Sequence, residues 1–152
     1  MKRRHFLVSL LTLSLMKLNA VNFREEKPEA WIKSNLNSAA AALYGDKKFA
    51  AIKESTKVEL IAAKSIVRDP EQIPIQIKSK IKAKSVAIFQ DANPQSLVTV
   101  FTVEEDGIID YELNIKMEIK GTLFVVVEGI DGVLYYARQF IDVVHLRCSG
   151  AQ

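Results

Sequence analysis

The sequence predicts an all-β protein, an immunoglobulin-like β-sandwich of about seven strands with one N-terminal helix. Apolar and polar residues alternate with a period of two along several short segments from Val58 onward, as in strands with one buried face. Turn signals separate these segments at roughly even spacing. With 152 residues and 49% hydrophobic content, the chain is long enough to form one domain with a substantial core.

Residues 1–20 predict an export signal peptide rather than part of the core. Lys2, Arg3 and Arg4 form a basic start, an apolar run follows, and Ala20 ends a passable cleavage site. The Arg3-Arg4 pair resembles a twin-arginine export signal, with an ordinary secretory signal as the alternative. The apolar run has about half the ~20 residues that span a bilayer. We therefore expect no membrane anchor and a mature protein in the periplasm.

The charge balance gives no reason to expect nucleic acid or a membrane surface as a partner. Residues 1–20 contain four of the 21 basic residues and none of the 18 acidic ones. The rest of the chain therefore has 17 basic and 18 acidic residues, a net charge of −1. A nearly neutral chain of this kind lacks the excess positive charge that favours polyanionic partners.

The segment 21–57 is predicted to be a helical lead. Pro28 begins a helical pattern, and Gly45 stands where a helix would be capped. The apolar residues that fall near one face of this helix are Trp31, Ile32, Leu36, Ala39, Ala40 and Leu43. A charged connector follows, with a short second helical turn expected around Phe49–Ile52.

The segment 58–146 is predicted to form the β-sandwich. Strands are expected at Val58–Val67, Ile73–Lys82, Ser85–Gln90, Leu97–Val103, Tyr111–Lys120, Leu123–Glu128 and Val133–Leu146. Asp131-Gly132 predicts a hairpin turn between the last two strands. Leu97–Val103 and Leu123–Val127 are apolar on both faces, which is typical of strands buried on both sides. We expect a protein partner to cover the second face.

The residue inventory argues against a catalytic, metal or cofactor site in the mature chain. Only one histidine, His145, and one cysteine, Cys148, remain after residue 20, too few for a His/Cys metal site. The chain has no nucleophile-elbow motif and no glycine-rich phosphate loop. Along a strand, His145 and Cys148 would point to opposite faces, which disfavours a Cys–His pair. We therefore expect a protein that is not an enzyme.

Cys148 lies four residues before the end of the chain, and residues 147–152 are predicted to form a C-terminal arm. A single cysteine cannot form an internal disulfide, and a thiol near a chain end can be presented to other molecules. The neighbouring Arg147 favours the nucleophilic thiolate form. The alternative interpretation is a small hydrophobic residue at the end of a core strand. We interpret Cys148 as the reactive residue of this protein.

Several short segments occur in an order that resembles one known family. They are Ala42-Leu43-Tyr44-Gly45-Asp46, Arg68-Asp69-Pro70-Glu71-Gln72-Ile73-Pro74-Ile75, Asn93-Pro94, Ile115-Lys116-Met117, Asp131-Gly132 with Tyr135 and Ala137-Arg138, and the terminal cysteine. In this order they resemble the SoxY family, the sulfur-carrier subunit of the periplasmic thiosulfate-oxidising system, and the resemblance covers most of Trp31–Cys148.

This resemblance implies that Cys148 is a covalent attachment point for sulfur rather than a catalyst. In such carriers a c-type cytochrome joins thiosulfate oxidatively to the cysteine, and other sulfur-oxidising enzymes release sulfate and oxidise the remaining sulfur. The resemblance also implies a heterodimer with a companion β-sandwich subunit, SoxZ-like, that lacks the attachment cysteine. It implies no cofactor bound by this chain.

The arm departs from the family pattern, which is Gly-Gly-Cys-Gly-Gly. Here the matching residues are Leu146-Arg147-Cys148-Ser149-Gly150, so only Gly150 keeps a glycine. Because glycine gives backbone freedom and a thin chain, an arm with Arg147 and Ser149 is expected to be stiffer and bulkier. A second function class stays open at this point: an exported β-sandwich that binds a partner through an intermolecular disulfide at Cys148.

Overall fold

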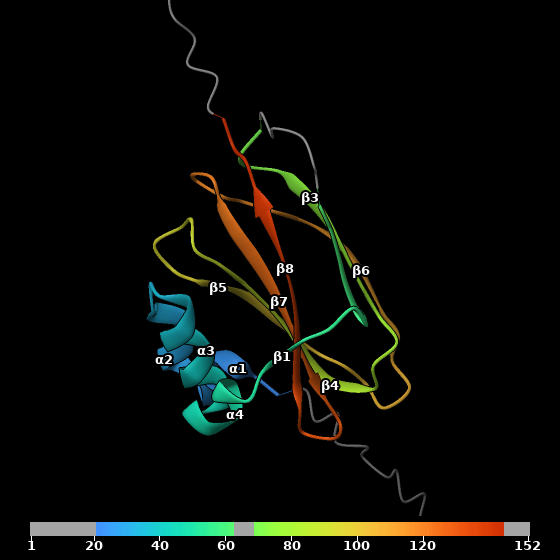
Figure 1. The fold of residues 1–152 in the computed structure, drawn as a ribbon. Helices are drawn as coiled ribbons and strands as arrows, with labels where there is room; N and C mark the ends of the chain where they lie inside the picture. The colour runs from blue at the N-terminus through green and yellow to red at the C-terminus, as the bar shows by residue number, and fades with distance from the viewer. Residues whose placement is uncertain (1–20, 63–68, 145–152) are drawn as a thin grey trace, which may run out of the picture.

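The computed structural model describes residues 21–62 and 69–144 of the chain. Four short helices precede eight strands, and the strands form two sheets (Figure 1). The helices are α1 (Phe23–Glu26), α2 (Pro28–Ile32), α3 (Leu36–Tyr44) and α4 (Asp46–Ala50). The strands are β1 (Lys53–Glu54), β2 (Val58–Ala62), β3 (Ile73–Ser79), β4 (Ala83–Gln90), β5 (Leu97–Thr102), β6 (Ile109–Ile115), β7 (Gly121–Gly129) and β8 (Leu134–Ile141). The predicted all-β, immunoglobulin-like class is confirmed.

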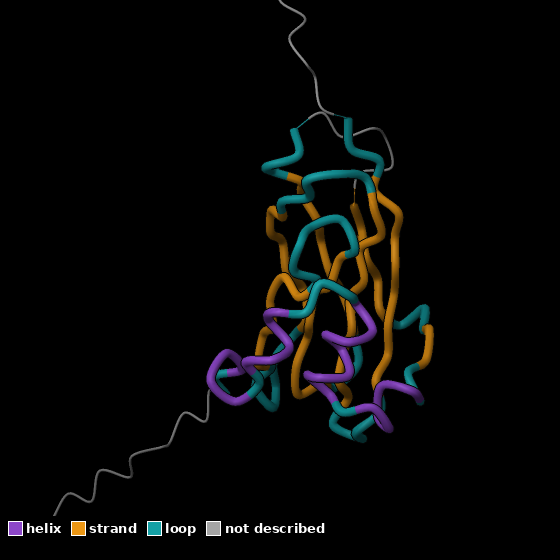
Figure 2. Tube along the Cα trace, turned by 90° about the vertical axis from the view of Figure 1, so that its left-hand side faces the viewer, coloured by secondary structure: helices purple, strands orange, loops and turns teal. Residues whose placement is uncertain are grey.

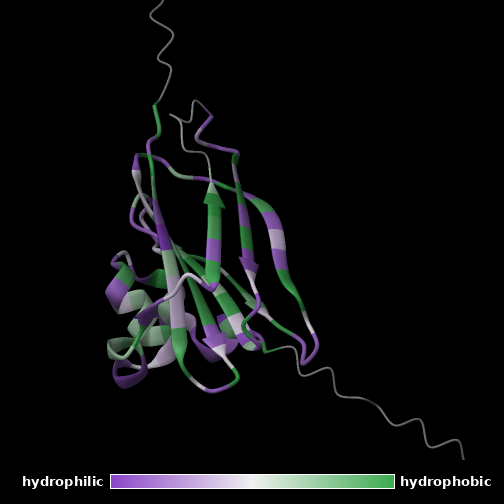
Figure 3. Cartoon of the chain, turned by 45° about the vertical axis from the view of Figure 1, so that its right-hand side comes forward, coloured by the Kyte–Doolittle hydropathy of each residue, from purple (hydrophilic) through white to green (hydrophobic). Residues whose placement is uncertain are grey.

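The smaller sheet has the order β2-β3-β6, with both pairs antiparallel. Ile73, Ile75 and Ile77 of β3 are buried, whereas Pro74 between them is exposed. Figure 3 shows hydrophobic and hydrophilic residues alternating along the strands of this sheet. The period-two pattern in the sequence therefore marks one face of the sheet as core and the other as surface.

Strand β6 ends earlier than the alternation predicts, at Ile115 rather than at Lys120. The backbone beyond it bonds to other segments instead of a neighbouring strand: the Met117 N–H donates to the carbonyl of Pro70. Met117 is still fully buried, but Ile119 is 57% exposed. The prediction of a strand through Lys120 was wrong because the backbone after Ile115 forms hydrogen bonds with residues of a turn and not with a neighbouring strand. Of the strand predicted over 58–67, β2 covers the first five residues, and 63–68 lie outside the described residues.

The larger sheet has the order β1-β8-β7-β4-β5, and only the β1–β8 pair is parallel. One face packs on the β2-β3-β6 sheet, and Leu123, Val125 and Val127 of β7 belong to that core. The other face carries Val126 of β7, with Ala87 and Phe89 of β4, and packs against the helices. Figure 2 shows the helices in front of the strands on this side.

This packing corrects one expectation from the sequence. Leu97–Val103 and Leu123–Val127 are indeed apolar on both faces, and the chain's own helices pack on the second face. On β5, Val98 packs in the core between the sheets, and Leu97 packs under the helices. These two segments therefore do not by themselves require a partner, because the helices form a third layer, and a partner subunit stays a prediction.

The helical lead is also divided differently from the prediction of one helix from Pro28 to Gly45. At Lys33 the backbone is extended, and its carbonyl accepts a hydrogen bond of 3.0 Å from the N–H of Ser96. The chain then restarts as α3, where the Asn35 side chain accepts hydrogen bonds from two backbone N–H groups as an N-cap. Gly45 ends α3 with a φ of +88°, which confirms the predicted cap.

Candidate functional site

The predicted site residues Cys148, Arg147, Ser149 and Gly150, as well as His145, lie outside the described residues. The described chain ends at Val144, four residues before Cys148. It begins at Val21 near the opposite end of the sandwich (Figure 1). The described residues nearest in sequence to Cys148 are those that follow the end of β8.

The sandwich core holds the chain until just before its described end. Ile141, the last residue of β8, pairs with Gly121 and is fully buried, and Val143 is only 7% exposed in the same core. Phe140 and Val144 alternate with these two and are 59% and 41% exposed. Burial of Val143 anchors the segment from which Cys148 continues.

A buried glutamine organises the turn between β4 and β5 at this end of the sandwich. The Gln90 side chain is fully buried, and its Oε1 accepts hydrogen bonds of 2.6 Å from the N–H groups of Ala92 and Asn93. Its Nε2 donates to the carbonyl of Gln95 at 2.7 Å, and the Ser96 hydroxyl donates to the Gln90 carbonyl. Because all its polar groups are paired, this buried amide holds the turn in one conformation.

The same turn is bonded to the segment between β6 and β7. The Asn93 side chain donates to the Lys116 carbonyl at 2.8 Å and accepts from the Glu118 N–H at 2.7 Å. Asp91 accepts a hydrogen bond of 2.6 Å from the Thr122 N–H. Gly121 lies so close to the Asp91 carboxylate that a Cβ there would overlap it. The two turns therefore form one bonded unit beside the end of β8.

A third segment, the residues before β3, joins this unit. The Pro70 carbonyl accepts the Met117 N–H at 3.0 Å, and the Glu71 carboxylate contacts the Lys116 ammonium group at 2.9 Å. The hydrogen bond to Glu71 is the main cause of the raised pKa of Lys116. Three of the segments that carry the family resemblance, around Pro70, Asn93 and Lys116, thus meet at the end of the sandwich from which Cys148 continues. The sequence alone does not show this, because more than 20 residues separate the segments.

A second polar cluster, which the sequence analysis missed, lies between the helices and the larger sheet. The Ser85 hydroxyl donates to the Glu128 carboxylate at 3.0 Å, and Lys48 of α4 pairs with the same carboxylate. The Tyr44 hydroxyl is buried beside the Ser85 hydroxyl and makes no hydrogen bond of ordinary geometry to any described residue. Burial, followed by the nearby Glu128 carboxylate, raises the pKa of Tyr44. Through the Lys48–Glu128 pair, this cluster connects α4 to the larger sheet.

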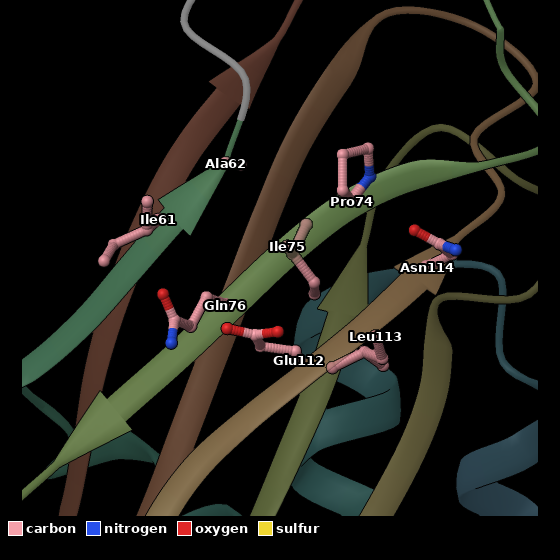
Figure 4. Close-up of a pocket in the computed structure, with 8 residues that line it drawn as sticks. All are labelled: Ile61, Ala62, Pro74, Ile75, Gln76, Glu112, Leu113 and Asn114. Carbon is pink, nitrogen blue, oxygen red and sulfur yellow. The ribbon is translucent and has the colours of Figure 1, made fainter.

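A hollow of about 450 Å³ lies on the outer face of the β2-β3-β6 sheet (Figure 4). Ile61, Pro74 and Leu113 supply apolar surface, while Gln76, Glu112 and Asn114 supply polar groups. The described residues that line it include no histidine, serine or cysteine. Within residues 21–62 and 69–144, no three His, Cys, Asp or Glu side chains come together as a metal site. In that part of the chain, no helix has the length and hydropathy needed to cross a membrane.

Comparison with solved structures shows which proteins share this fold. The structure of the sulfur carrier protein SoxY from Chlorobium limicola f thiosulfatophilum superposes with a TM-score of 0.64 at 29% identity, covering 73% of this chain and 97% of that one. A superoxide reductase (neelaredoxin) from Ignicoccus hospitalis superposes with a TM-score of 0.52 at 12% identity, over 58% and 80% of the two chains. A putative superoxide reductase from Thermotoga maritima gives 0.51 at 15% identity, over 63% and 96%. The two reductases share the fold alone.

Comparison of sequences identifies the family. No curated protein matches this chain significantly. The family described as sulfur oxidation protein SoxY matches residues 40–148, which include all eight strands of the described residues and end on the cysteine. The match covers well over half of the chain and agrees with the likeness to the Chlorobium carrier and with the resemblance drawn from the sequence. This chain belongs to the SoxY family of sulfur oxidation proteins.

Proposed function

We propose that the mature protein is a periplasmic sulfur carrier that holds thiosulfate-derived intermediates covalently on Cys148 while other enzymes process them. Family membership and the likeness to a SoxY carrier support a sulfur carrier in sulfur oxidation. The observation that carries the proposal is that the family match ends on Cys148, the only cysteine of the chain. Burial of Val143 supports a firm anchor for the segment that bears it.

The chemistry needs only a thiolate on this chain. The Cys148 thiolate sulfur forms a bond with the terminal sulfur of thiosulfate, and the two electrons removed pass to a c-type cytochrome, one for each ferric haem that is reduced. Water then attacks the sulfonate sulfur, sulfate leaves with the release of two protons, and a persulfide stays on Cys148. Arg147 favours the thiolate and the anionic adduct by its charge. The carrier itself catalyses no step of this sequence.

The partners in this proposal are a companion β-sandwich subunit, a c-type cytochrome and the other sulfur-oxidising enzymes. The companion and the carrier form a heterodimer, and the exported complex works in the periplasm. Residues 1–20 supply the twin-arginine-like export signal, which suits a protein that folds before transport. The arm keeps only Gly150 of the family's glycines. It is therefore stiffer than the family arm, and Ser149 and Arg147 select enzymes with a wider entrance.

Intact-mass measurement of the protein purified from thiosulfate-grown cells tests this function. We expect a mass increment that a thiol reductant removes, that is absent from Cys148→Ser, and that disappears when thiosulfate is withheld. Cells carrying Cys148→Ser should also lose thiosulfate oxidation, whereas Ser149→Ala should keep the increment. If the wild-type protein carries no such increment and Cys148→Ser cells oxidise thiosulfate normally, the carrier function is wrong. A disulfide-linked pair on a non-reducing gel would instead indicate the interaction protein described above.

A further inference from the structure

We infer that the end of the sandwich opposite Val144 binds a second copy of this chain. The β3–β4 turn, the β5–β6 loop and the β7–β8 hairpin are at this end (Figure 1). The turn carries lysines, the loop carries carboxylates, and exposed isoleucines lie beside them. We call this surface the turn end. The inference does not depend on the proposed carrier function.

Two adjoining hollows mark the basic side of the turn end. Their volumes are about 440 and 380 Å³, and Lys57 and Lys80 line both of them. Lys82 also lines the larger hollow. All three lysines are exposed, and none forms an ion pair with another described residue. Their positive charges are therefore available to a partner.

The carboxylates on this side are mostly engaged within the chain. Asp131 accepts two hydrogen bonds inside its own hairpin, and Asp110 lies 3.8 Å from the Lys78 ammonium group. Glu59 is the remaining carboxylate among the described residues that line the two hollows. Four lysines thus face three carboxylates there, and the lysines without an ion pair are those at and beside the turn.

The β5–β6 loop supplies the acidic side. Its residues Glu104–Asp106, the acidic loop, are all exposed, and none of their carboxylates forms an ion pair with another described residue. The Val103 N–H donates to the Lys84 carbonyl at 2.9 Å, and the Gly107 N–H donates to the Glu104 carbonyl at 2.8 Å. These bonds hold the acidic loop beside the start of β4, next to the lysine-bearing turn.

Exposed apolar side chains connect the two sides. Ile108 is 82% exposed, follows the acidic loop and lines one hollow together with Lys57 and Lys80. Ile130 is 58% exposed and lines the other hollow. The Ile130 N–H donates to the Lys82 carbonyl at 2.9 Å, which joins the β7–β8 hairpin to the β3–β4 turn. The acidic loop, the isoleucines and the lysines therefore form one continuous surface.

A second copy of the chain complements both charged sides at once. In a two-fold dimer the same surface of each copy meets itself, so the acidic loop of one copy can face the lysines of the other, and the reverse. A nucleic acid or an anionic membrane would be attracted by the lysines but repelled by the neighbouring acidic loop. Because the surface is small, we expect a reversible dimer with a dissociation constant of about 10 µM or weaker.

This dimer leaves the far ends of both copies uncovered. Strand β8 runs from Leu134, beside the hairpin of the turn end, to Ile141 at the other end of the sandwich. Two copies joined at their turn ends therefore direct the ends of β8 away from each other. The residues that follow β8 stay accessible in each copy.

Charge reversal tests the dimer. The first variant is Lys80→Glu with Lys82→Glu, and the second is Glu104→Lys with Glu105→Lys. The control, Lys116→Glu with Lys120→Glu, makes the same change in net charge as the first variant but at the opposite end of the sandwich, where Lys116 has only an exposed ion pair. Sedimentation velocity of the mature protein over a concentration series measures association. A thiol reductant removes any disulfide-linked pair, and circular dichroism checks that each variant is folded.

We expect the wild-type chain and the control to form dimers. Each of the other two variants alone should associate about ten-fold more weakly or less, because like charges then face each other. A one-to-one mixture of these two variants should dimerise again, since one has an acidic and the other a basic turn end. Raising the salt from about 0.1 M to about 1 M shortens the Debye length from about 10 Å to about 3 Å and should weaken the wild-type dimer.

Three results would overturn the inference. The first is a wild-type chain that stays monomeric at the highest concentration, and the second is an equal loss of association in the control. The third is a mixture of the two variants that fails to dimerise. Binding of a monomeric wild-type chain to phosphatidylglycerol vesicles, abolished by Lys80→Glu with Lys82→Glu, would assign the lysines to a membrane surface instead.

Discussion

Asn93 and Glu118, which are 25 residues apart, are joined by a hydrogen bond of 2.7 Å from the Glu118 N–H to the Asn93 side-chain oxygen. The same amide donates to the carbonyl of Lys116. One side chain thus connects the β4–β5 turn to the β6–β7 segment at the end of the sandwich that leads to the arm. The geometry around this link yields several expectations for folding.

Asn93→Ala should lower the free energy of unfolding by about 1–3 kcal/mol, because it removes two hydrogen bonds worth about 0.5–1.5 kcal/mol each. Urea denaturation followed by Trp31 fluorescence measures the change. Asn114→Ala, an exposed amide on the outer face of β6, is the matched control and should change stability by less than about 0.5 kcal/mol. Equal effects for the two variants would show that the link contributes nothing.

Gly121→Ala should destabilise the fold by about 1–3 kcal/mol, because the new Cβ overlaps the Asp91 carboxylate and lies 3.0 Å from the Cβ of Ala92. The overlap would also disturb the bond from the Thr122 N–H to Asp91. In a double-mutant cycle with Asp91→Ala, the cost of Gly121→Ala should shrink, because the overlapping group is gone. Strictly additive costs would contradict the close approach.

Tyr44→Phe should leave stability at pH 7 unchanged or raise it by about 1 kcal/mol, since it removes a buried hydroxyl without a partner. The folded state also raises the pKa of Tyr44 above its ordinary value of 10.0. The folded protein therefore holds this proton more tightly than the unfolded chain. The part of the folding stability that depends on a protonated phenol is complete below pH 10 and is lost as the pH rises above that value.

Urea denaturation at pH 7 and pH 11 checks both parts of this expectation. The wild-type protein should lose more stability between the two pH values than Tyr44→Phe does. Tyr136→Phe, which removes a phenol hydroxyl with an exposed contact to Glu54, is the control at pH 7 and should not stabilise the fold. A clear loss of stability in Tyr44→Phe at pH 7 would mean that its hydroxyl is paired.

Replacing Arg3 and Arg4 together by lysine should stop export and leave the precursor in the cytoplasm, because a twin-arginine route requires both arginines. Cell fractionation with mass measurement of the N-terminus detects the precursor and the mature chain. Lys2→Arg keeps the basic start and should be exported normally. Undiminished export of the lysine variant would indicate the ordinary secretory route.

The sequence predicted the structure well where a local pattern of residues sufficed. Alternation along Ile73–Ile77 predicted a half-buried strand, and Gly45 predicted the end of a helix, and both are confirmed. The ends of elements were predicted less well. The strand expected through Lys120 stops at Ile115, because the backbone beyond it forms hydrogen bonds with the Asn93 side chain and the Pro70 carbonyl instead of with a neighbouring strand, and no local pattern reveals such partners.

The sequence by itself determined the fold class, the family and the candidate attachment residue. Period-two burial needs only neighbouring residues, and a single cysteine can be identified without coordinates. Only the tertiary structure decided what covers the second face of the larger sheet, which the chain's own helices occupy, and what surrounds the root of the arm. Apolar residues on both faces of a strand indicate that both faces are buried, but they do not indicate which segments bury them. The convergence of Pro70, Asn93 and Lys116, and the exposure of Phe140, depend on contacts between distant segments that only the folded chain brings together.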